Sequence, residues 1–406
     1  MRITYIHQYF KTPDMAGGTR SYEFARRLVE RGHEVHVITG ETNGGRARIS
    51  TESGIVVHWL PVPYANSMSY SRRIWAFLSF VCRSTAVAGR LRHDLVFATS
   101  TPLTVAIPGV FAALRRRVPM VFEVRDLWPE VPIAMGALRS PVTRWAARRL
   151  EAWAYRRSAH VIALSVGMAA SIRRRFPGVP VTVVPNGSDR ALFGGADAKQ
   201  AAAALRRATP WLQDRPLILY AGTLGVANGV DYLARMAVPL AGIDPDVRIA
   251  ILGEGRMREQ VRRLAAELGV LDRNLFLLGP VPKTDVVAFV AACDLATALT
   301  IDVPGLSPDS SNKLIDAFAA GRPVAVNHGG WIADLITASG AGLVLPPDDP
   351  AAAAAAVAAF VRDPGATSTA RTAAAALARD RFDRDLLFQE FERVLTGSVR
   401  TTEGVR

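Results

Sequence analysis

A lysine and an aspartate one helical turn apart are well suited to bind an anionic ligand. Lys313 and Asp316 follow Ser310 and Ser311, which are favourable N-cap residues, so a helix should begin there. The amides and dipole at its start, together with Lys313, would hold the phosphates of a nucleotide diphosphate. Asp316 would accept hydrogen bonds from the ribose hydroxyls. The alternative is an ordinary capped helix with a solvated Lys313–Asp316 pair.

Lysine is rare in this sequence, which makes its position informative. Only four lysines occur, Lys11, Lys199, Lys283 and Lys313, and arginine supplies the remaining positive side chains. In a chain whose positive side chains are mostly arginines, composition alone would more often place an arginine at the start of this helix.

Three turns carry glycine where a strand should pass into a helix. They contain Gly17-Gly18, Gly222-Thr223 and Gly253-Glu254. Glycine lets the backbone approach a ligand closely, although a plain tight turn explains any one of them equally well. None has the G-x-G-x-x-G spacing of a dinucleotide site. Together with the lysine helix, they predict a diphosphate held between two domains.

Charged residues and a tryptophan follow another expected strand, in the sequence EVRDLWPE at residues 123–130. Polar clusters at the carboxyl ends of strands are typical of ligand-binding or catalytic sites in α/β folds. We expect Asp126 and Glu130 to orient or deprotonate an acceptor hydroxyl, with Arg125 beside them. The alternative is an Arg125–Asp126 ion pair that only fixes the loop.

Short apolar strands alternate with helices in both halves of the chain, which predicts an α/β fold with parallel sheets covered on both faces. Strands are expected at residues 2–7, 34–39, 55–60, 94–99, 118–124, 160–164, 181–184, 216–220, 247–252, 274–278, 294–298, 323–326 and 342–345. The pattern breaks near residues 185–215. We expect a first domain over residues 1–190, a linker at 191–214 and a second domain over 215–384. Residues 385–406 should form a helix and tail that pack back toward the first domain.

Composition narrows the possible partners. The chain has 406 residues, half of them apolar, and a formal net charge of +13, which favours an acidic partner or substrate. Its two cysteines are expected to be buried thiols in a reducing compartment. No leader sequence or membrane-spanning run is expected. A nicotinamide dehydrogenase is disfavoured because the dinucleotide motif is absent, and nucleic-acid binding because no recognised module carries the charge.

The chain resembles the family 4 retaining glycosyltransferases of the GT-B fold. It is most similar to a bacterial subgroup around fucosamine and N-acetylhexosamine transferases of O-antigen and capsule synthesis. The matching stretches run nearly end to end. They are GG at 17–18, RGHEV at 31–35, RDLWPE at 125–130, VPNGSD at 184–189, GTLG at 222–225, GEG at 253–255, NK at 312–313 through Gly321, and NHGGWIAD at 327–334.

The resemblance implies two Rossmann-like doubly wound domains facing each other across a cleft, a nucleotide-sugar donor such as a UDP-sugar, retention of configuration and no metal. It implies transfer of an N-acetylated hexosamine or deoxyhexosamine to a lipid-diphosphate-linked saccharide in cell-surface polysaccharide biosynthesis. Lys313 would stabilise the departing diphosphate, and no covalent nucleophile is evident. The expected donor-binding residues are Gly17, Gly18, Gly222, Thr223, Gly253, Glu254, Ser311, Asn312, Lys313 and Asp316.

The sequence departs from the wider family at several of these positions. A frequent first glutamate of the donor helix is replaced by Pro308, and an arginine and a lysine after the glycine turn are replaced by Thr223 and Asn228. A histidine common in the first domain is replaced by Arg125. Neutralisation of the diphosphate therefore falls mostly to Lys313, helped by Arg125.

Two other function classes fit the same residues. A nucleotide-sugar epimerase of related architecture would use the same diphosphate clamp and would form free epimer without an acceptor. A non-catalytic scaffold would bind the nucleotide sugar without turnover.

The first domain has two stretches without acidic residues, at 53–93 and 131–150. Residues 69–92 predict an amphipathic helix with a basic stripe opposite a bulky apolar side. We expect peripheral binding to the inner face of the cytoplasmic membrane, where a lipid-linked acceptor would lie. The alternatives are a core-packing helix and a generally arginine-rich composition. The expected membrane-facing residues are Arg72, Arg73, Trp75, Phe77, Arg83, Arg144 and Trp145.

Overall fold

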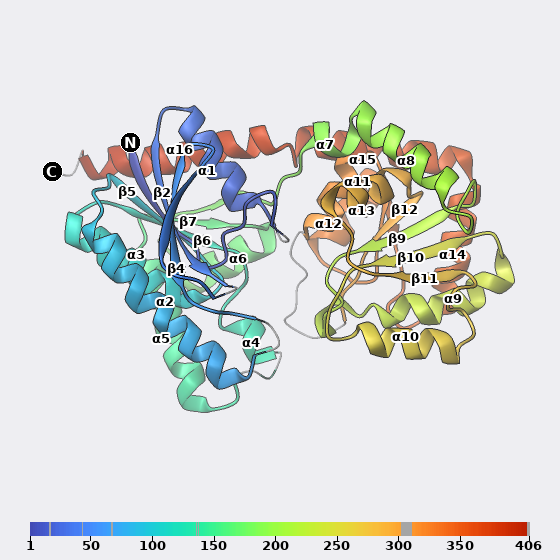
Figure 1. Cartoon of the computed structure of the whole chain (residues 1–406), viewed down its shortest axis with the longest axis horizontal. Helices are drawn as coiled ribbons and strands as arrows, with labels where there is room; N and C mark the ends of the chain where they lie inside the picture. Colours follow the sequence, from blue (N-terminus) through green and yellow to red (C-terminus); the bar gives the residue numbers. More distant parts are fainter. Residues whose placement is uncertain are drawn as a thin grey trace. The chain divides into compact units, whose positions relative to one another are not determined.

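The computed structural model describes residues 1–15, 18–42, 44–65, 68–134, 136, 138–301 and 311–403. The chain forms two compact units (Figure 1). One comprises Met1–Pro185 with Leu387–Arg406, and the other comprises Asn186–Leu386. Residues 191–214, which we expected to form a linker, lie in the second unit. They include the helices α7 (Arg190–Gly194) and α8 (Ala196–Ala208).

The first unit is built on an eight-stranded sheet of order β3-β4-β2-β1-β5-β6-β7-β8. Its strands are β1 (Arg2–Ile6), β2 (Glu34–Glu41), β3 (Arg48–Glu52), β4 (Ile55–Pro61), β5 (Leu95–Thr99), β6 (Met120–Val124), β7 (His160–Ala163) and β8 (Val181–Val183). All pair in parallel except β3, which runs antiparallel to β4 at the edge. The sequence did not predict β3, because its segment RISTE has a single bulky apolar residue and lies half in water.

Helices cover both faces of this sheet (Figure 1). They are α1 (Arg20–Glu30), α2 (Tyr70–Arg90), α3 (Ala106–Arg116), α4 (Glu130–Ala134), α5 (Pro141–Arg157), α6 (Val166–Arg175), α16 (Arg384–Glu403) and the short 3-10 helix η1 (Leu103–Val105). Apolar residues of α2, α3, α5 and α6 pack on one face. Those of α1 and of α16 from Leu387 onward pack on the other, where Phe24 contacts Phe391 with ring centroids 4.7 Å apart.

A buried ion pair ties α1 to the sheet of the first unit. Arg20 donates to the Glu123 carboxylate from Nη2 at 2.8 Å and from Nε at 3.0 Å, and both side chains are almost fully buried. The other Glu123 oxygen accepts a hydrogen bond from Thr99 at 2.6 Å. Arg20 also donates to the carbonyls of Val184 and Pro185, which follow β8. The pair therefore fixes the start of α1 against the carboxyl ends of three strands.

The second unit has a six-stranded, all-parallel sheet of order β11-β10-β9-β12-β13-β14. Its strands are β9 (Leu217–Ala221), β10 (Arg248–Leu252), β11 (Leu275–Leu278), β12 (Leu295–Ala298), β13 (Val324–Val326) and β14 (Gly342–Val344). Besides α7 and α8, its helices are η2 (Val226–Asn228), α9 (Asp231–Ile243), α10 (Arg258–Glu267), α11 (Lys283–Ala292), α12 (Asn312–Ala319), α13 (Trp331–Ser339), α14 (Pro350–Arg362) and α15 (Pro364–Asp380). Each unit is thus a Rossmann-like, doubly wound domain, as the sequence predicted.

Two loops at the carboxyl ends of β9 and β10 pack backbone against backbone. The Gly222 amide donates to the Leu252 carbonyl at 2.9 Å, and the Leu224 amide donates to the Glu254 carbonyl at 2.8 Å. Gly253 has a φ of +138°, and a Cβ there would lie 1.9 Å from the Gly222 oxygen. Glycine is therefore required at 253 for both its conformation and its close contact.

The ion pair of the first unit should contribute strongly to stability. Arg20→Ala leaves the buried Glu123 carboxylate without its main counter-charge, so we expect the free energy of unfolding to fall by about 3–5 kcal/mol. Arg26→Ala is the matched control on the same helix, because Arg26 pairs with Glu23 and Glu30 near the surface. That control should cost less than about 1 kcal/mol. Urea unfolding compares them, and equal losses would contradict a special role for Arg20.

The close contact of the second unit predicts a contrast between two glycines that each follow a strand. Gly253→Ala should lower the free energy of unfolding by more than about 1 kcal/mol, because both the backbone conformation and the neighbouring carbonyl oppose a Cβ. Gly279→Ala is the control, since no heavy atom lies within 4 Å of a Cβ there. Calorimetry of both variants should show a lower unfolding temperature only for Gly253→Ala. Unchanged stability of Gly253→Ala would refute the requirement.

Candidate active site

Lys313 lies in the first turn of α12 and reaches the loop after β9. Its Nζ donates to the Tyr220 hydroxyl at 3.0 Å and lies 4.4 Å from the centroid of the Tyr220 ring. The Tyr220 hydroxyl in turn donates to the Thr223 carbonyl at 2.7 Å. A Cβ on Gly222 would lie 2.9 Å from the Lys313 Cε. The side chain is therefore positioned by a buried strand residue and by a glycine that leaves room for it.

The environment of Lys313 favours binding of an anion. In the described part of the chain, no carboxylate forms an ion pair with it, so the solvated Lys313–Asp316 pair considered above does not form. Burial lowers the pKa of Lys313 from its usual 10.5 to about 8. A charged amine removed from water without a counter-ion is costly, and a bound phosphate would reduce that cost.

The structure brings several predicted donor-binding residues to one edge of the second sheet. Gly222 and Thr223 adjoin Lys313, and their loop is hydrogen-bonded to the one that holds Gly253 and Glu254. The Glu254 side chain is largely exposed and lies 3.4 Å from Arg258. Ser311 is the N-cap of α12 by backbone position, but its side chain accepts no capping hydrogen bond. Asn312 is exposed at the first helical position.

Asp316 has a partner that the sequence reasoning did not identify. Its Oδ1 accepts a hydrogen bond from the buried Ser188 hydroxyl at 2.6 Å. Ser188 belongs to the VPNGSD stretch, which was recognised but given no role. Its amide donates to the Phe382 carbonyl, so the segment after β8 helps to orient the carboxylate on α12.

In the first unit, Arg125 approaches a buried histidine. Its Nη1 lies 3.3 Å from His7 Nε2, which must act as the acceptor because a guanidinium can only donate. Burial, followed by the charges of Arg125 and Lys11, lowers the pKa of His7 well below 6.5. His7 is therefore neutral at pH 7, with its proton on Nδ1. Neither His7 nor Tyr220 was predicted as a site residue, although both end or follow buried strands.

The other charged residues of this loop have separate partners. Asp126 accepts a hydrogen bond from Thr101 at 2.7 Å, whereas Arg125 approaches His7, and no ion pair joins the two residues in the described part of the chain. Glu130 pairs with Arg175 at 2.7 Å, and Arg175 also pairs with Glu151 at 2.8 Å. Since Glu130 holds α4 to α6, Asp126 is the better placed candidate for contact with an acceptor.

Some predicted site residues remain without a structural test. Gly17 and Ser310 lie outside the described residues, and so does Pro308. Gly18 is exposed before α1. Among the residues that the structure describes, no group of three or more His, Cys, Asp or Glu side chains is placed to hold a metal ion.

The predicted membrane-facing residues divide into two groups. Arg72 and Arg83 are exposed, as are Trp75 on α2 (70% exposed) and Trp145 on α5 (65%). The other three are partly buried and have local contacts: Phe77 stacks on Tyr64, Arg73 lies over the same ring, and Arg144 donates to the Leu138 carbonyl.

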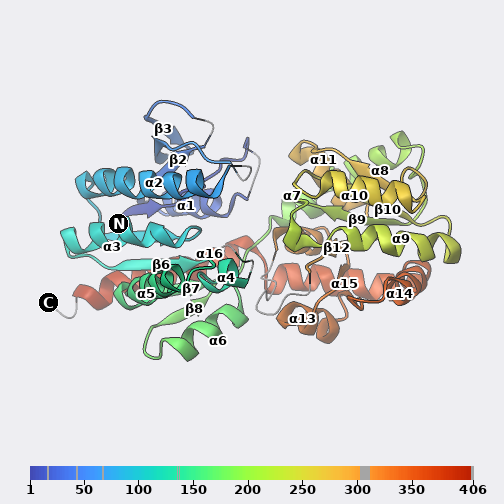
Figure 2. The same cartoon turned by 90° about the horizontal axis from the view of Figure 1, so that it is seen from below.

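The predicted apolar side of α2 is also only partly buried. Of the apolar residues expected there, Ala88 is buried but Ile74 and Leu78 are exposed, and the core contacts of α2 come also from Ala76 and Phe80, which were not assigned to that side. Further exposed apolar residues lie on α3, which contacts both α2 and α5 (Figure 2). None of the described helices is sufficiently long and apolar to cross a membrane.

Curated relatives cover most of the chain. A D-inositol 3-phosphate glycosyltransferase of Xylanimonas cellulosilytica is 27% identical over 389 residues, covering 90% of this chain and 88% of the relative. A GDP-mannose-dependent alpha-(1-6)-phosphatidylinositol monomannoside mannosyltransferase of Mycolicibacterium smegmatis is 27% identical over 298 residues, covering 68% and 72%. The comparisons do not single out a fucosamine or O-antigen subgroup.

Solved structures and family models agree on the architecture. Anabaena HepE in complex with UDP and glucose superposes with a TM-score of 0.72 at 20% identity, covering 98% of this chain and 100% of that one. Sucrose-phosphate synthase of Thermosynechococcus elongatus gives a TM-score of 0.76 at 17% identity, covering 97% and 98%. Residues 16–187 match the glycosyl transferase 4-like domain, and residues 215–363 match the glycosyl transferases group 1 family. The chain therefore belongs to the glycosyltransferases of the GT-B fold, with a 4-like first domain and a group 1 second domain.

Proposed function

We propose that the protein transfers a sugar from a UDP-sugar to an acceptor hydroxyl with retention of configuration. The observation that carries this proposal is the desolvated Lys313 ammonium, held at the start of α12 without an acidic partner among the described residues. As the donor bond breaks, negative charge develops on the leaving diphosphate. Lys313 and the free amides of α12 would stabilise that charge in the transition state.

The remaining donor-site residues have supporting roles in this proposal. Asp316, oriented by Ser188, would accept hydrogen bonds from the ribose hydroxyls. The loops with Gly222 and Gly253 would let backbone amides approach the phosphates. The UDP complex of the structurally similar HepE supports a uridine donor, whereas the mycobacterial relative is named for GDP-mannose. The first assay should therefore include both UDP-sugars and GDP-sugars.

For the acceptor side, we propose that Asp126 orients or deprotonates the attacking hydroxyl, with Arg125 nearby. The sugar would be an N-acetylated hexosamine or deoxyhexosamine, and the acceptor a lipid-diphosphate-linked saccharide of cell-surface polysaccharide biosynthesis. These assignments rest on the family resemblance. Nucleotide release that requires such an acceptor would support them, whereas free epimer formed without acceptor would support an epimerase.

Lys313 provides the direct test of the mechanism. Lys313→Met keeps the length of the side chain but removes its charge, so turnover should fall by about 100-fold or more, as for a lost oxyanion donor. Because the pKa of Lys313 is lowered to about 8 in the free protein, wild-type kcat/KM should fall as pH rises through 8. Lys313→Arg is the charge-retaining control and should lack this inflection, because a guanidinium stays protonated.

Steady-state assays of nucleotide release between pH 6 and 10 would measure both effects, with circular dichroism confirming that each variant is folded. Near-normal turnover of Lys313→Met would remove Lys313 from the mechanism. We also propose that no metal takes part, since Lys313 and the helix dipole would supply the neutralisation. Full activity in excess EDTA is expected. Loss of activity in EDTA and its recovery with magnesium or manganese would overturn this part.

The exposed surface of α2 and α5 supports peripheral binding to the inner face of the cytoplasmic membrane. Two tryptophans and neighbouring exposed arginines would contact anionic headgroups, each basic residue contributing on the order of 1 kcal/mol. Replacing Arg72 and Arg83 with Glu should therefore reduce the fraction bound to phosphatidylglycerol liposomes by about tenfold or more. Added salt should weaken wild-type binding. Arg73 is omitted because it packs on Tyr64.

The matched control makes the same change in net charge on the second unit. Arg262 and Arg263 are exposed on α10, and their replacement with Glu should leave liposome binding nearly unchanged. A second variant, Trp75→Ala with Trp145→Ala, should reduce binding without changing net charge. Co-sedimentation measures all four proteins. Equal recovery of wild type and the Arg72/Arg83 variant in the lipid pellet would refute the membrane proposal.

A further inference from the structure

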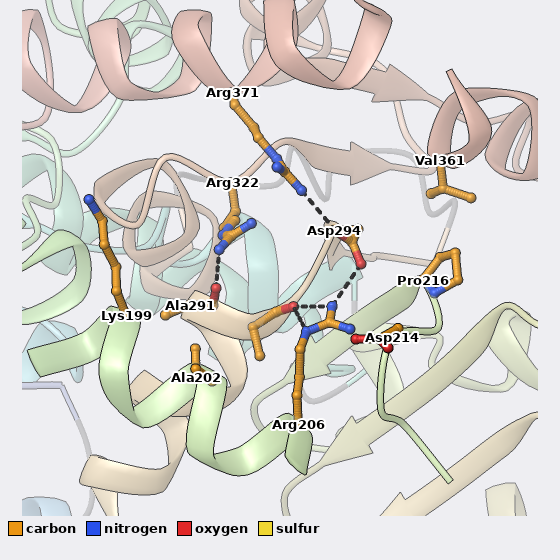
Figure 3. A pocket seen from close by; sticks show the side chains of 12 residues that line it. Lys199, Ala202, Arg206, Asp214, Pro216, Ala291, Asp294, Arg322, Val361 and Arg371 are labelled. Carbon is orange, nitrogen blue, oxygen red and sulfur yellow. Dashed lines mark hydrogen bonds and ion pairs between the residues drawn. The ribbon is translucent and has the colours of Figure 1, made fainter. Parts of the chain in front are cut away.

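The second unit contains a cavity of about 520 Å³ (Figure 3). It lies at the amino ends of the strands of its sheet, whereas the candidate donor site lies at their carboxyl ends. Three of its lining residues precede strands: Pro216 lies before β9, Asp294 before β12 and Arg322 before β13. Gly222 and Gly253, in contrast, follow the carboxyl ends of β9 and β10. In a parallel sheet the amino ends and the carboxyl ends of the strands lie on opposite sides, so the cavity is separate from the candidate nucleotide-sugar site.

Positive charge exceeds negative charge around the cavity by two. Its ionisable lining residues are Lys199 and Arg206 on α8, Arg371 on α15, Arg322, and the two acids Asp214 and Asp294. Four cations and two carboxylates leave a net charge of +2. A phosphomonoester dianion carries nearly the opposite charge at pH 7, whereas a single carboxylate would leave one positive charge uncompensated.

Asp294 neutralises only part of this cluster. One of its oxygens accepts from Arg371 Nη2 at 2.8 Å, and the other accepts from Arg206 Nη2 and the Leu217 amide, both at 2.9 Å. Arg206 also donates to the carbonyls of Ala292, Gln213 and Arg215. All the donors of Arg206 are thus in use, and its role is structural.

Arg322 and Arg371 are much less completely bonded. Arg322 donates from Nη2 to the Ala291 carbonyl and forms no ion pair with a described acidic residue, as Figure 3 illustrates. The Nε of each residue is buried and has no acceptor in the described part of the chain. Burial and the nearby charge of Arg371 both lower the pKa of Arg322. Two closely spaced guanidinium groups with spare donors, and the exposed Lys199 ammonium, suit an oxyanion.

The cavity also has a wall for an uncharged part of a ligand. Ala202 and Ala203 on α8 and Ala291 and Ala292 at the end of α11 supply small apolar surfaces. Its volume lies in the range of small-molecule sites and exceeds what a bare phosphate would fill. We propose that this cavity is a second ligand site that binds the phosphomonoester group of a small molecule through Arg322, Arg371 and Lys199.

The proposal predicts that phosphate stabilises the full-length protein through these three residues. The unfolding temperature is measured by calorimetry at pH 7.5 with inorganic phosphate or glucose 6-phosphate against chloride at equal ionic strength. Both anions should raise the wild-type value by several degrees. The increase should fall to less than half in Arg322→Met and Arg371→Met. Lys199→Met, which changes an exposed side chain and should fold normally, must also reduce it.

Arg379→Met is the matched control, because Arg379 lies on α15 with Arg371 but pairs with the exposed Asp380. It should retain the full increase. Without phosphate, Arg322→Met should be at least as stable as wild type, because it removes a buried charge that lacks a carboxylate partner. No increase in wild type would overturn the proposal. So would an equal increase in all cavity variants, since the anion would then bind elsewhere, such as at Lys313.

A second arm distinguishes the source of the phosphomonoester. Co-sedimentation with phosphatidylcholine liposomes is compared with and without phosphatidic acid. Binding that needs phosphatidic acid and is lost in Arg322→Met would support the site with a lipid headgroup as its ligand. The alternative outcome is stabilisation by glucose 6-phosphate together with liposome binding that Arg322→Met leaves unchanged. It would support the site with a soluble phosphorylated metabolite as its ligand.

Discussion

The candidate donor site depends on one buried positive charge that the described protein leaves uncompensated. Lys313 contacts a tyrosine ring and hydroxyl but no carboxylate in the described residues, and this desolvation lowers its pKa. In the first unit, the almost fully buried Arg20 is compensated by Glu123 and by two carbonyls. The contrast separates structural from functional charge. A charge that only stabilises a fold has its counter-charge within the protein. A charge that binds an anionic ligand must lack such a counter-charge until the ligand is bound.

The elements around Lys313 bring this charge to the point where we propose that the donor binds. Helix α12 starts at the carboxyl edge of the sheet, which places its free amides and its lysine at the same point. The loops after β9 and β10 touch through their backbones, and glycine is the residue that permits this contact. A side chain at Gly222 would collide with Lys313, and one at Gly253 would collide with the Gly222 carbonyl. The lysine, the helix start and the glycine loops therefore form one arrangement.

Much of the fold could be predicted from the sequence, because buried parallel strands are short apolar runs separated by helices. The edge strand β3 could not, since four of its five residues are polar and its pairing comes from β4. The places of Gly222 and Gly253 after strands and of Lys313 at a helix start could be predicted, because turn chemistry and helix starts are local signals. Tyr220 and His7 could not, because their roles depend on residues brought close only by the sheet. The same holds for Ser188, whose contact with Asp316 spans 128 positions, and for Arg73 and Phe77, which pack on Tyr64.

The choice of lysine at position 313 follows from the geometry of its contacts. In a chain that otherwise uses arginine almost throughout, a compact ammonium occupies the space between the Tyr220 ring and the Gly222 backbone. A planar guanidinium would keep the charge but would spread it over five donors, each of which needs a partner. In the cavity with Arg322 and Arg371, a carbonyl oxygen such as that of Ala291 accepts from the forked group. The two sites thus carry different cations, and the diphosphate leaving group that we propose would meet the point charge of Lys313 rather than a forked guanidinium.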